Sequence, residues 1–161
     1  MPTHALDDVD IQLLNALQSN ARVKRQDLAH LVNLSIPAVS ERLRKLKEAG
    51  YIIVHATHLE PHLCGLDVTA FVIVQSTTSL QYQEFTERVN QFPEILECHS
   101  VTGDGSHILK IRTENTRKLE SVLSEIQRWP GVTRTKSNIV LSTYKETLAV
   151  PLGHLMEKKA N

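Results

Sequence analysis

The chain has 161 residues, of which 41% are hydrophobic and 22% are charged, and its formal net charge is zero. These values are typical of a folded protein with one medium or two small domains, and they exclude a long disordered or low-complexity chain. No apolar stretch reaches the roughly 20 residues that span a bilayer, and the N-terminus has no basic segment leading into an apolar one. The sequence therefore predicts a cytoplasmic protein, with Cys64 and Cys98 as buried free thiols.

The zero net charge conceals an uneven distribution of charge. Residues 21–47 contain seven basic and two acidic side chains, a local excess of five positive charges, so the rest of the chain is mildly acidic. Such a stretch is a candidate surface for the phosphates of a nucleic acid. Its basic members are Arg22, Lys24, Arg25, Arg42, Arg44, Lys45 and Lys47.

The beginning of the chain has the pattern of two helices and a sharp turn. Asp7 precedes a run with helical apolar spacing, and Asp10 three residues later completes the pattern of a capping box. A second helix is predicted over residues 26–32. Asn33 follows it and tolerates the left-handed backbone that a sharp turn needs.

A third helix is predicted to begin after Ser35, which is a suitable N-cap, with Pro37 in the first turn and an end at Gly50. Its apolar residues recur at helical spacing and predict an inward stripe of Val39, Leu43 and Leu46. We therefore expect a helix-turn-helix domain over residues 1–52, followed by a linker strand or hinge over 53–66.

The outward face of this third helix predicts contact with DNA. Short polar residues in its N-terminal half can enter a major groove, and its basic C-terminal half can meet phosphates. The alternative is an ordinary three-helix unit with a solvated basic face. The candidate DNA-binding residues are Arg22, Ser35, Ile36, Pro37, Ala38, Ser40, Glu41, Arg42, Arg44 and Lys45, with Arg22, Arg42, Arg44 and Lys45 on phosphates.

The remainder of the chain, residues 67–161, contains an internal repeat. Each half has a strand, a helix, an aromatic-proline pair and a second strand. The expected strands are 67–75, 95–102, 107–113 and 132–144, and the expected helices are 80–91 and one capped by Asn115 or Thr116. This βαββαβ order indicates a ferredoxin-like arrangement with both helices on one face of the sheet.

The whole sequence thus predicts an α+β protein with an N-terminal three-helix winged helix-turn-helix domain and a C-terminal ferredoxin-like βαββαβ domain. Two helices cannot cover both faces of the sheet, and we expect the apolar residues Val72, Val74, Ile139 and Leu141 to require a partner. The sequence therefore predicts a homodimer formed through this domain.

The segment Gly103-Asp104-Gly105-Ser106 joins the two halves of the repeat. Asp-Gly is typical of a hairpin turn, which is the structural interpretation. The functional alternative is a loop whose carboxylate and free N–H groups bind the ammonium and carboxylate of an amino acid.

Three stretches in order, LDDVDIQLLNALQSNAR, DLAHLVNLSIPAVSERLRKLKEAGYI and ILECHSVTGDGSHILKI, resemble the Lrp/AsnC, or feast/famine, transcriptional regulators over essentially the whole chain. The resemblance implies double-stranded DNA as partner, dimers that commonly assemble into octamers, and no cofactor. It also implies an amino acid or related effector bound between dimers, beside the loop Val101–Ser106. The implied contacts are Val101, Thr102, Gly103, Asp104, Gly105 and Ser106, with Thr133 and Thr135 as further polar contacts.

The chain departs from the family in this loop. Members that sense leucine-like effectors often carry an Asp-Tyr pair where this chain has Ser106 and His107. Asp104 is then the only acid in the loop, and the identity of the effector, or whether there is one, stays open.

The sequence leaves three alternatives to a DNA-binding regulator. Siroheme decarboxylases resemble this family, but the region around His99 lacks the residues that accompany their histidine. A metal site is suggested by the cluster His55, His58, His62 and Cys64, although a strand would point His55 and His58 to opposite faces. A ligand-binding module without DNA binding is the third, and the intact basic helix argues against it.

Overall fold

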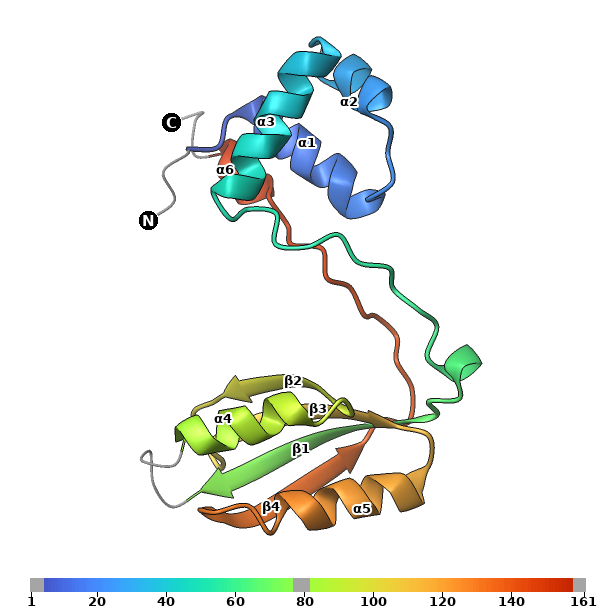
Figure 1. Ribbon diagram of the computed structural model, residues 1–161, viewed down its shortest axis with the longest axis vertical. Coiled ribbons are helices and arrows are strands. Elements are labelled where there is room, and N and C mark those ends of the chain that lie inside the picture. The colour runs from blue at the N-terminus through green and yellow to red at the C-terminus, as the bar shows by residue number, and fades with distance from the viewer. Residues whose placement is uncertain (1–4, 77–81, 158–161) are drawn as a thin grey trace. The chain divides into compact units, whose positions relative to one another are not determined.

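The computed structural model describes residues 5–76 and 82–157, which divide into two units (Figure 1). The first unit combines the residues up to 58 with those from 145 onward, and the second comprises 59–144. The sequence predicts that all of residues 67–161 form one domain. Residues 145–157 instead belong with the helices of the first unit, where Leu152 packs against the core. None of the helices in these described ranges combines the length and apolar character needed to cross a membrane.

The first unit is a bundle of helices. Its members are α1 (Asp8–Ser19), α2 (Arg25–Leu31), α3 (Ile36–Glu48) and the short α6 (Gly153–Glu157). The predicted inward stripe of α3 is confirmed, since it packs against the apolar sides of α1 and α2. Residues 53–61 have no regular secondary structure, so the linker strand predicted there is absent from this described stretch. The buried core contains Leu13, Leu14, Leu28, Ala29, Val32, Val39, Leu43 and Leu46.

The predicted local features of the helix ends are confirmed. The Asp10 N–H donates to Asp7 Oδ1 at 2.8 Å, and Asp7 N–H donates to Asp10 Oδ2 at 3.2 Å, which is a complete capping box. Ser35 Oγ accepts from the N–H of Ala38 at 3.3 Å and caps α3. Asn33 has φ of +52°, the left-handed conformation expected for the turn between α2 and α3.

The C-terminal segment is fastened to α1 by a side-chain amide. Gln18 Nε2 donates to the carbonyl of Val150 at 3.1 Å, and the Val150 N–H donates to Gln18 Oε1 at 2.6 Å. Leu152 then packs against the core of the first unit, and α6 lies against α1 (Figure 1). Local sequence patterns do not predict this return, because Gln18 and Val150 are 132 positions apart.

The second unit is a four-stranded antiparallel sheet with two helices. After a 3₁₀ turn (His62–Cys64), its elements are β1 (Val68–Ser76), α4 (Tyr82–Gln91), β2 (Ile95–Ser100), β3 (His107–Thr113), α5 (Thr116–Ile126) and β4 (Val132–Ile139). The strand order is β2-β3-β1-β4, which confirms the ferredoxin-like βαββαβ fold. The predicted helix start at Leu80 lies outside the described residues. The last strand ends at Ile139 rather than at Tyr144, because its pairing with β1 ends there.

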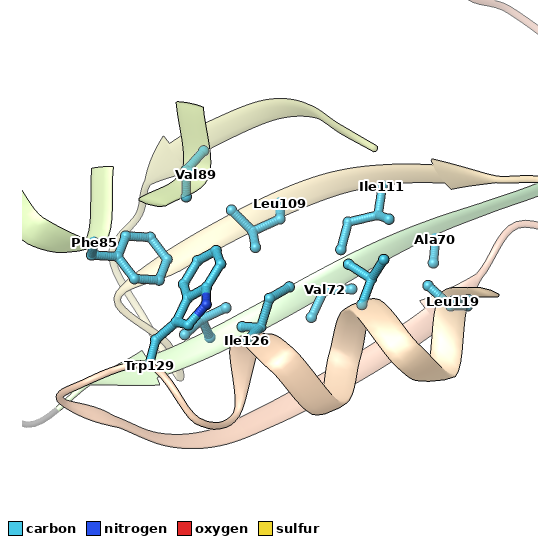
Figure 2. Close-up of a cluster of buried hydrophobic side chains, with 11 residues drawn as sticks. Ala70, Val72, Phe85, Val89, Leu109, Ile111, Leu119, Ile126 and Trp129 are labelled. Atoms are coloured by element: carbon cyan, nitrogen blue, oxygen red, sulfur yellow. The ribbon is translucent and has the colours of Figure 1, made fainter. Parts of the chain in front are cut away.

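Both helices cover the same face of the sheet (Figure 2). Ala70, Val72 and Val74 of β1 alternate with outward residues and are fully buried under α4 and α5. The expectation that Val72 and Val74 need an outside partner is therefore wrong, since the helices already cover them. The rest of this core is formed by Phe85, Val89, Leu109, Ile111, Leu119, Val122, Ile126 and Trp129.

The opposite face of the sheet carries a different apolar set. Phe71 and Ile73 occupy the alternate positions of β1, and Ile108 pairs with Ile73 across the ladder to β3. Phe71 is 39% exposed. Ile139 stands opposite the buried Ala70 and so belongs to the helix side, at the uncovered end of β4. Leu141, which is 95% exposed, lies beyond that strand. The sheet therefore has an apolar face that the helices do not cover, as predicted, but its residues are Phe71, Ile73 and Ile108.

Candidate nucleic-acid interface and ligand loop

The first turn of α3 is exposed, while the apolar stripe of the same helix is buried. The helix is held by Val39, Leu43 and Leu46, which are 5% exposed or less, so its position is fixed by packing. Ile36 is 47% exposed, and Ser35, Pro37 and Glu41 are also exposed. Ala38 and Ser40 are half-buried. A rigid helix that presents short side chains at one end has the shape that fits a major groove.

Arg42 does not have the environment predicted for a phosphate contact. Its Nη1 donates to Asp7 Oδ2 at 2.7 Å and to Asp10 Oδ1 at 2.8 Å, so it joins α3 to the capping box of α1. Partial burial acts to raise the pKa of Asp7, but the bonds from the Asp10 N–H and from Arg42 outweigh it and hold that pKa below its ordinary range. The guanidinium is thus engaged by two carboxylates that lie far away in the sequence.

The other predicted phosphate contacts of α3 are paired along the helix itself. Arg44 donates to Glu41 Oε1 at 2.7 Å from Nη2 and also bonds Glu48, while Lys45 Nζ lies 3.8 Å from Glu41. These pairs are exposed, and exposed pairs of this kind are weak enough to exchange for a phosphate. Arg22 is exposed in the turn between α1 and α2 and is free to point outward.

The predicted ligand loop connects β2 and β3. It is a six-residue bend over residues 101–106 rather than the tight turn that Asp-Gly indicated. The Val101 N–H donates to the carbonyl of Ser106 at 3.1 Å and closes its base, and Gly103 has φ of +109°. Residues with a side chain rarely adopt this φ, which explains why position 103 is a glycine.

The end of the loop is folded onto the last residues of β1. Ser106 N–H and Oγ both donate to the carbonyl of Val74, at 2.9 and 3.1 Å, and Ser76 Oγ donates to Ser106 Oγ at 3.1 Å. An added Cβ at Gly105 would lie 2.3 Å from Ile73 Cγ2, so only glycine fits this close approach. The loop is therefore shaped by β1.

His107 follows the loop and is only 3% exposed. Its ring stacks on Phe85 with 4.5 Å between centroids, and Nδ1 lies 3.1 Å from Ser106 Oγ. Burial lowers the pKa of His107 below its ordinary value. The pair Ser106 and His107 thus points into the protein and stabilises the loop, while Asp104 and Thr102 remain exposed.

Gln75 is a residue of this region that sequence reasoning missed. Its side-chain Nε2 donates to the backbone carbonyl of Asp104. Its backbone carbonyl accepts from Thr133 Oγ1 at 3.1 Å. The predicted contact Thr133 is therefore brought to the loop through Gln75. The hydroxyl of Thr135 accepts from Gln127 Nε2 at 2.8 Å instead. The sequence signal that could have identified Gln75 is the polar pair Gln75-Ser76 directly after an apolar strand.

The histidines of the linker do not form a metal site in the described part of the chain. His62 Nδ1 lies 3.1 Å from Asp67 Oδ1, and both side chains are exposed. Nowhere in residues 5–76 and 82–157 do three His, Cys, Asp or Glu side chains gather as metal ligands would. Cys64 is exposed rather than buried, since it lies in the 3₁₀ turn, and Cys98 is half-buried on β2.

Two family models match the two units. The model for a winged helix-turn-helix DNA-binding domain matches residues 6–53, and the model for the Lrp/AsnC ligand binding domain matches residues 69–150. Together they match both the first three helices and the whole sheet.

Similar proteins extend over nearly the full length of the chain. An HTH-type transcriptional regulator of Pyrococcus horikoshii is 33% identical over 91% of this chain and 97% of its own length. The leucine-responsive regulatory protein of Haemophilus influenzae is 34% identical, covering 89% of this chain and 88% of that protein.

A solved structure shares the fold. The crystal structure of a transcriptional regulator from Neisseria meningitidis in complex with L-methionine has a TM-score of 0.89 and 31% identity, over 94% of this chain and 99% of that one. With two family models, close relatives of matching length and this fold in agreement, the chain belongs to the Lrp/AsnC family of DNA-binding transcriptional regulators.

Proposed function

We propose that α3 reads double-stranded DNA with the residues at its N-terminal end. The observation that carries this proposal is the burial of Val39, Leu43 and Leu46, which leaves the start of the helix exposed and rigid. Few of the exposed side chains are long donors, so sequence discrimination by direct contact is modest. The base-facing set is Ser35, Ile36, Pro37, Ala38 and Ser40, with Glu41 beside it and Arg22, Arg44 and Lys45 toward the backbone.

The second unit senses a small metabolite in this proposal, and the chain acts as a regulator rather than an enzyme. The related regulator of Neisseria meningitidis was crystallised with L-methionine, which makes an amino acid the first candidate. The exposed carboxylate of Asp104 is suited to an ammonium group, and the backbone N–H groups of the exposed residues 102–104 are suited to a carboxylate. Thr133 supports this loop through Gln75.

Assembly joins the two activities. The open sheet face with Phe71, Ile73 and Ile108 is the proposed surface of a homodimer, because a monomer rarely exposes such a face. Dimers would assemble further, up to an octamer, with the effector bound between them. Several DNA-binding units then act together, in the cytoplasm where the DNA is, and the effector changes their spacing.

A mobility-shift assay on the DNA upstream of the protein's own coding sequence tests the DNA-binding proposal. We expect binding that weakens steeply with salt, and no binding at 50 mM salt would overturn it.

Thermal-shift measurements with each of the twenty amino acids, L-methionine first, test the effector proposal, because a ligand of the folded state raises the unfolding temperature. No shift with any of them at millimolar concentration would remove an amino acid as effector. Sedimentation at micromolar concentration tests assembly, and a monomer of 18.1 kDa would contradict it.

A further inference from the structure

Two grooves on the surface of the chain differ sharply in charge. The groove of the second unit lies along α5 and is charge-balanced, with Arg117, Lys118 and Arg128 against Glu94, Glu120 and Glu125. The groove of the first unit has a volume of about 400 Å³ and carries Arg25, Arg44, Lys47 and His55, with no acidic residue in its lining. We call this second one the cationic groove.

The cationic groove is formed by all three helices of the helix-turn-helix. Arg25 begins α2, whereas Ser40, Arg44 and Lys47 follow one another at helical spacing along one side of α3. Its floor is apolar, with Leu17 of α1, Val23, Leu28, Leu43 and Ile52. A cationic rim above an apolar floor fits a sugar–phosphate strand, which presents a charged phosphate beside an apolar deoxyribose.

The charges of the rim differ in how far they are already neutralised. Arg44 is paired with Glu41 and Glu48 on its own helix. Arg25 and Lys47 are exposed, and neither forms an ion pair with any residue in the described part of the chain. A phosphate that binds these two cations breaks no existing pair, so its full electrostatic attraction contributes to binding.

We propose that the cationic groove holds a DNA backbone phosphate between Arg25 and Lys47. This inference rests on the DNA binding proposed above. It selects Arg25 and Lys47 from the basic stretch 21–47, although neither is among the candidate DNA-binding residues predicted from the sequence. Arg25 lies on α2 and Lys47 on α3, so a phosphate shared by them fixes both helices against one strand. Phosphate contacts of this kind set the register in which a recognition helix enters the groove.

The test measures binding of the full-length protein to a 40-base-pair duplex by fluorescence anisotropy between 50 and 200 mM KCl. Arg25→Gln and Lys47→Gln are compared with the wild type and with Lys145→Gln. Lys145 is the matched control, because it is an exposed cation of the same unit outside the groove lining. Circular dichroism checks that each variant is folded, which is expected because all three side chains are exposed.

Each lost phosphate contact should reduce the slope of log K against log salt by about 0.9. We expect that reduction for Arg25→Gln and Lys47→Gln and an unchanged slope for Lys145→Gln. If the wild type binds DNA and both groove variants keep its slope, the cationic groove is not a phosphate site and the proposed function stands. Equal reductions in all three variants would show a diffuse charge effect and would also overturn the inference. If the wild type fails to bind at 50 mM KCl, the proposed function and this inference both fail.

Discussion

Arg42 on α3 donates from Nη1 to Oδ1 of Asp10 on α1, across 2.8 Å, and Asp10 is completely buried. The same nitrogen bonds Asp7, so one guanidinium links α3 to the capping box of α1. Arg42, which the sequence predicts to contact DNA, therefore holds in place the helix that we propose to contact DNA.

Replacement of Arg42 should therefore destabilise the fold before it affects DNA contacts. Arg42→Ala leaves the buried carboxylate of Asp10 without this partner, and the loss of free energy of unfolding should be about 2 kcal/mol or more. Urea denaturation followed by circular dichroism measures it. Arg44→Ala is the control, since its exposed pairs with Glu41 and Glu48 contribute far less. Unchanged stability of Arg42→Ala with weaker DNA binding would restore the original prediction of a phosphate contact.

The buried His107 predicts a pH dependence of stability. Its pKa is lowered by burial from an ordinary value of 6.5. The unfolded chain takes up a proton near pH 6.5, while the folded chain does so only at lower pH. Stability is therefore full above about pH 6.5 and falls as the pH drops below it.

Thermal unfolding of the wild type and of His107→Gln between pH 5.5 and 8 measures this effect. The amide keeps a hydrogen-bonding group near Ser106 but does not titrate, so the variant should lose part of the decline below pH 6.5. The exposed His58→Gln is the control and should decline as the wild type does. Equal pH profiles for wild type and His107→Gln would contradict the assignment.

Gly105→Ala should strain the ligand loop. The added Cβ would lie 2.3 Å from Ile73 Cγ2 and 3.0 Å from the carbonyl oxygen of Val74. We expect a loss of about 1–3 kcal/mol in free energy of unfolding, as for other overpacked sites. Ile73→Ala removes the colliding methyl group, so the double variant should lose less than the sum of the two single variants. Additive losses would show that the contact does not limit position 105.

The C-terminal return should contribute to the stability of the helix-turn-helix. Leu152→Ala removes part of a half-buried side chain from the core of the first unit and should cost about 1 kcal/mol. Leu148→Ala, at a side chain that is 87% exposed, is the control and should have little effect. Thermal denaturation of both variants, with a probe that reports on helix content, makes the comparison. Equal unfolding temperatures would mean that the tail does not support the bundle.

Local sequence information predicted the elements with few errors. The capping pair Asp7 and Asp10, the left-handed Asn33 and the cap Ser35 each follow from groups three or fewer residues apart. The repeated strand–helix–strand order likewise predicted the sheet topology. The prediction of a strand in the linker was wrong. A β-branched stretch forms a strand only where another strand pairs with it, and none of the described strands pairs with residues 53–58.

The sequence by itself determined which helices form, which stripe of α3 is buried and that a helix-turn-helix precedes a βαββαβ sheet, because periodicity and cap chemistry act over a few residues. Only the tertiary structure decided which basic residues of α3 remain available. Arg42 is bound by carboxylates 35 and 32 positions away, and Gln18 is bound to a segment 132 positions away. A charge counted in the sequence becomes a binding charge only when no such distant partner has taken it.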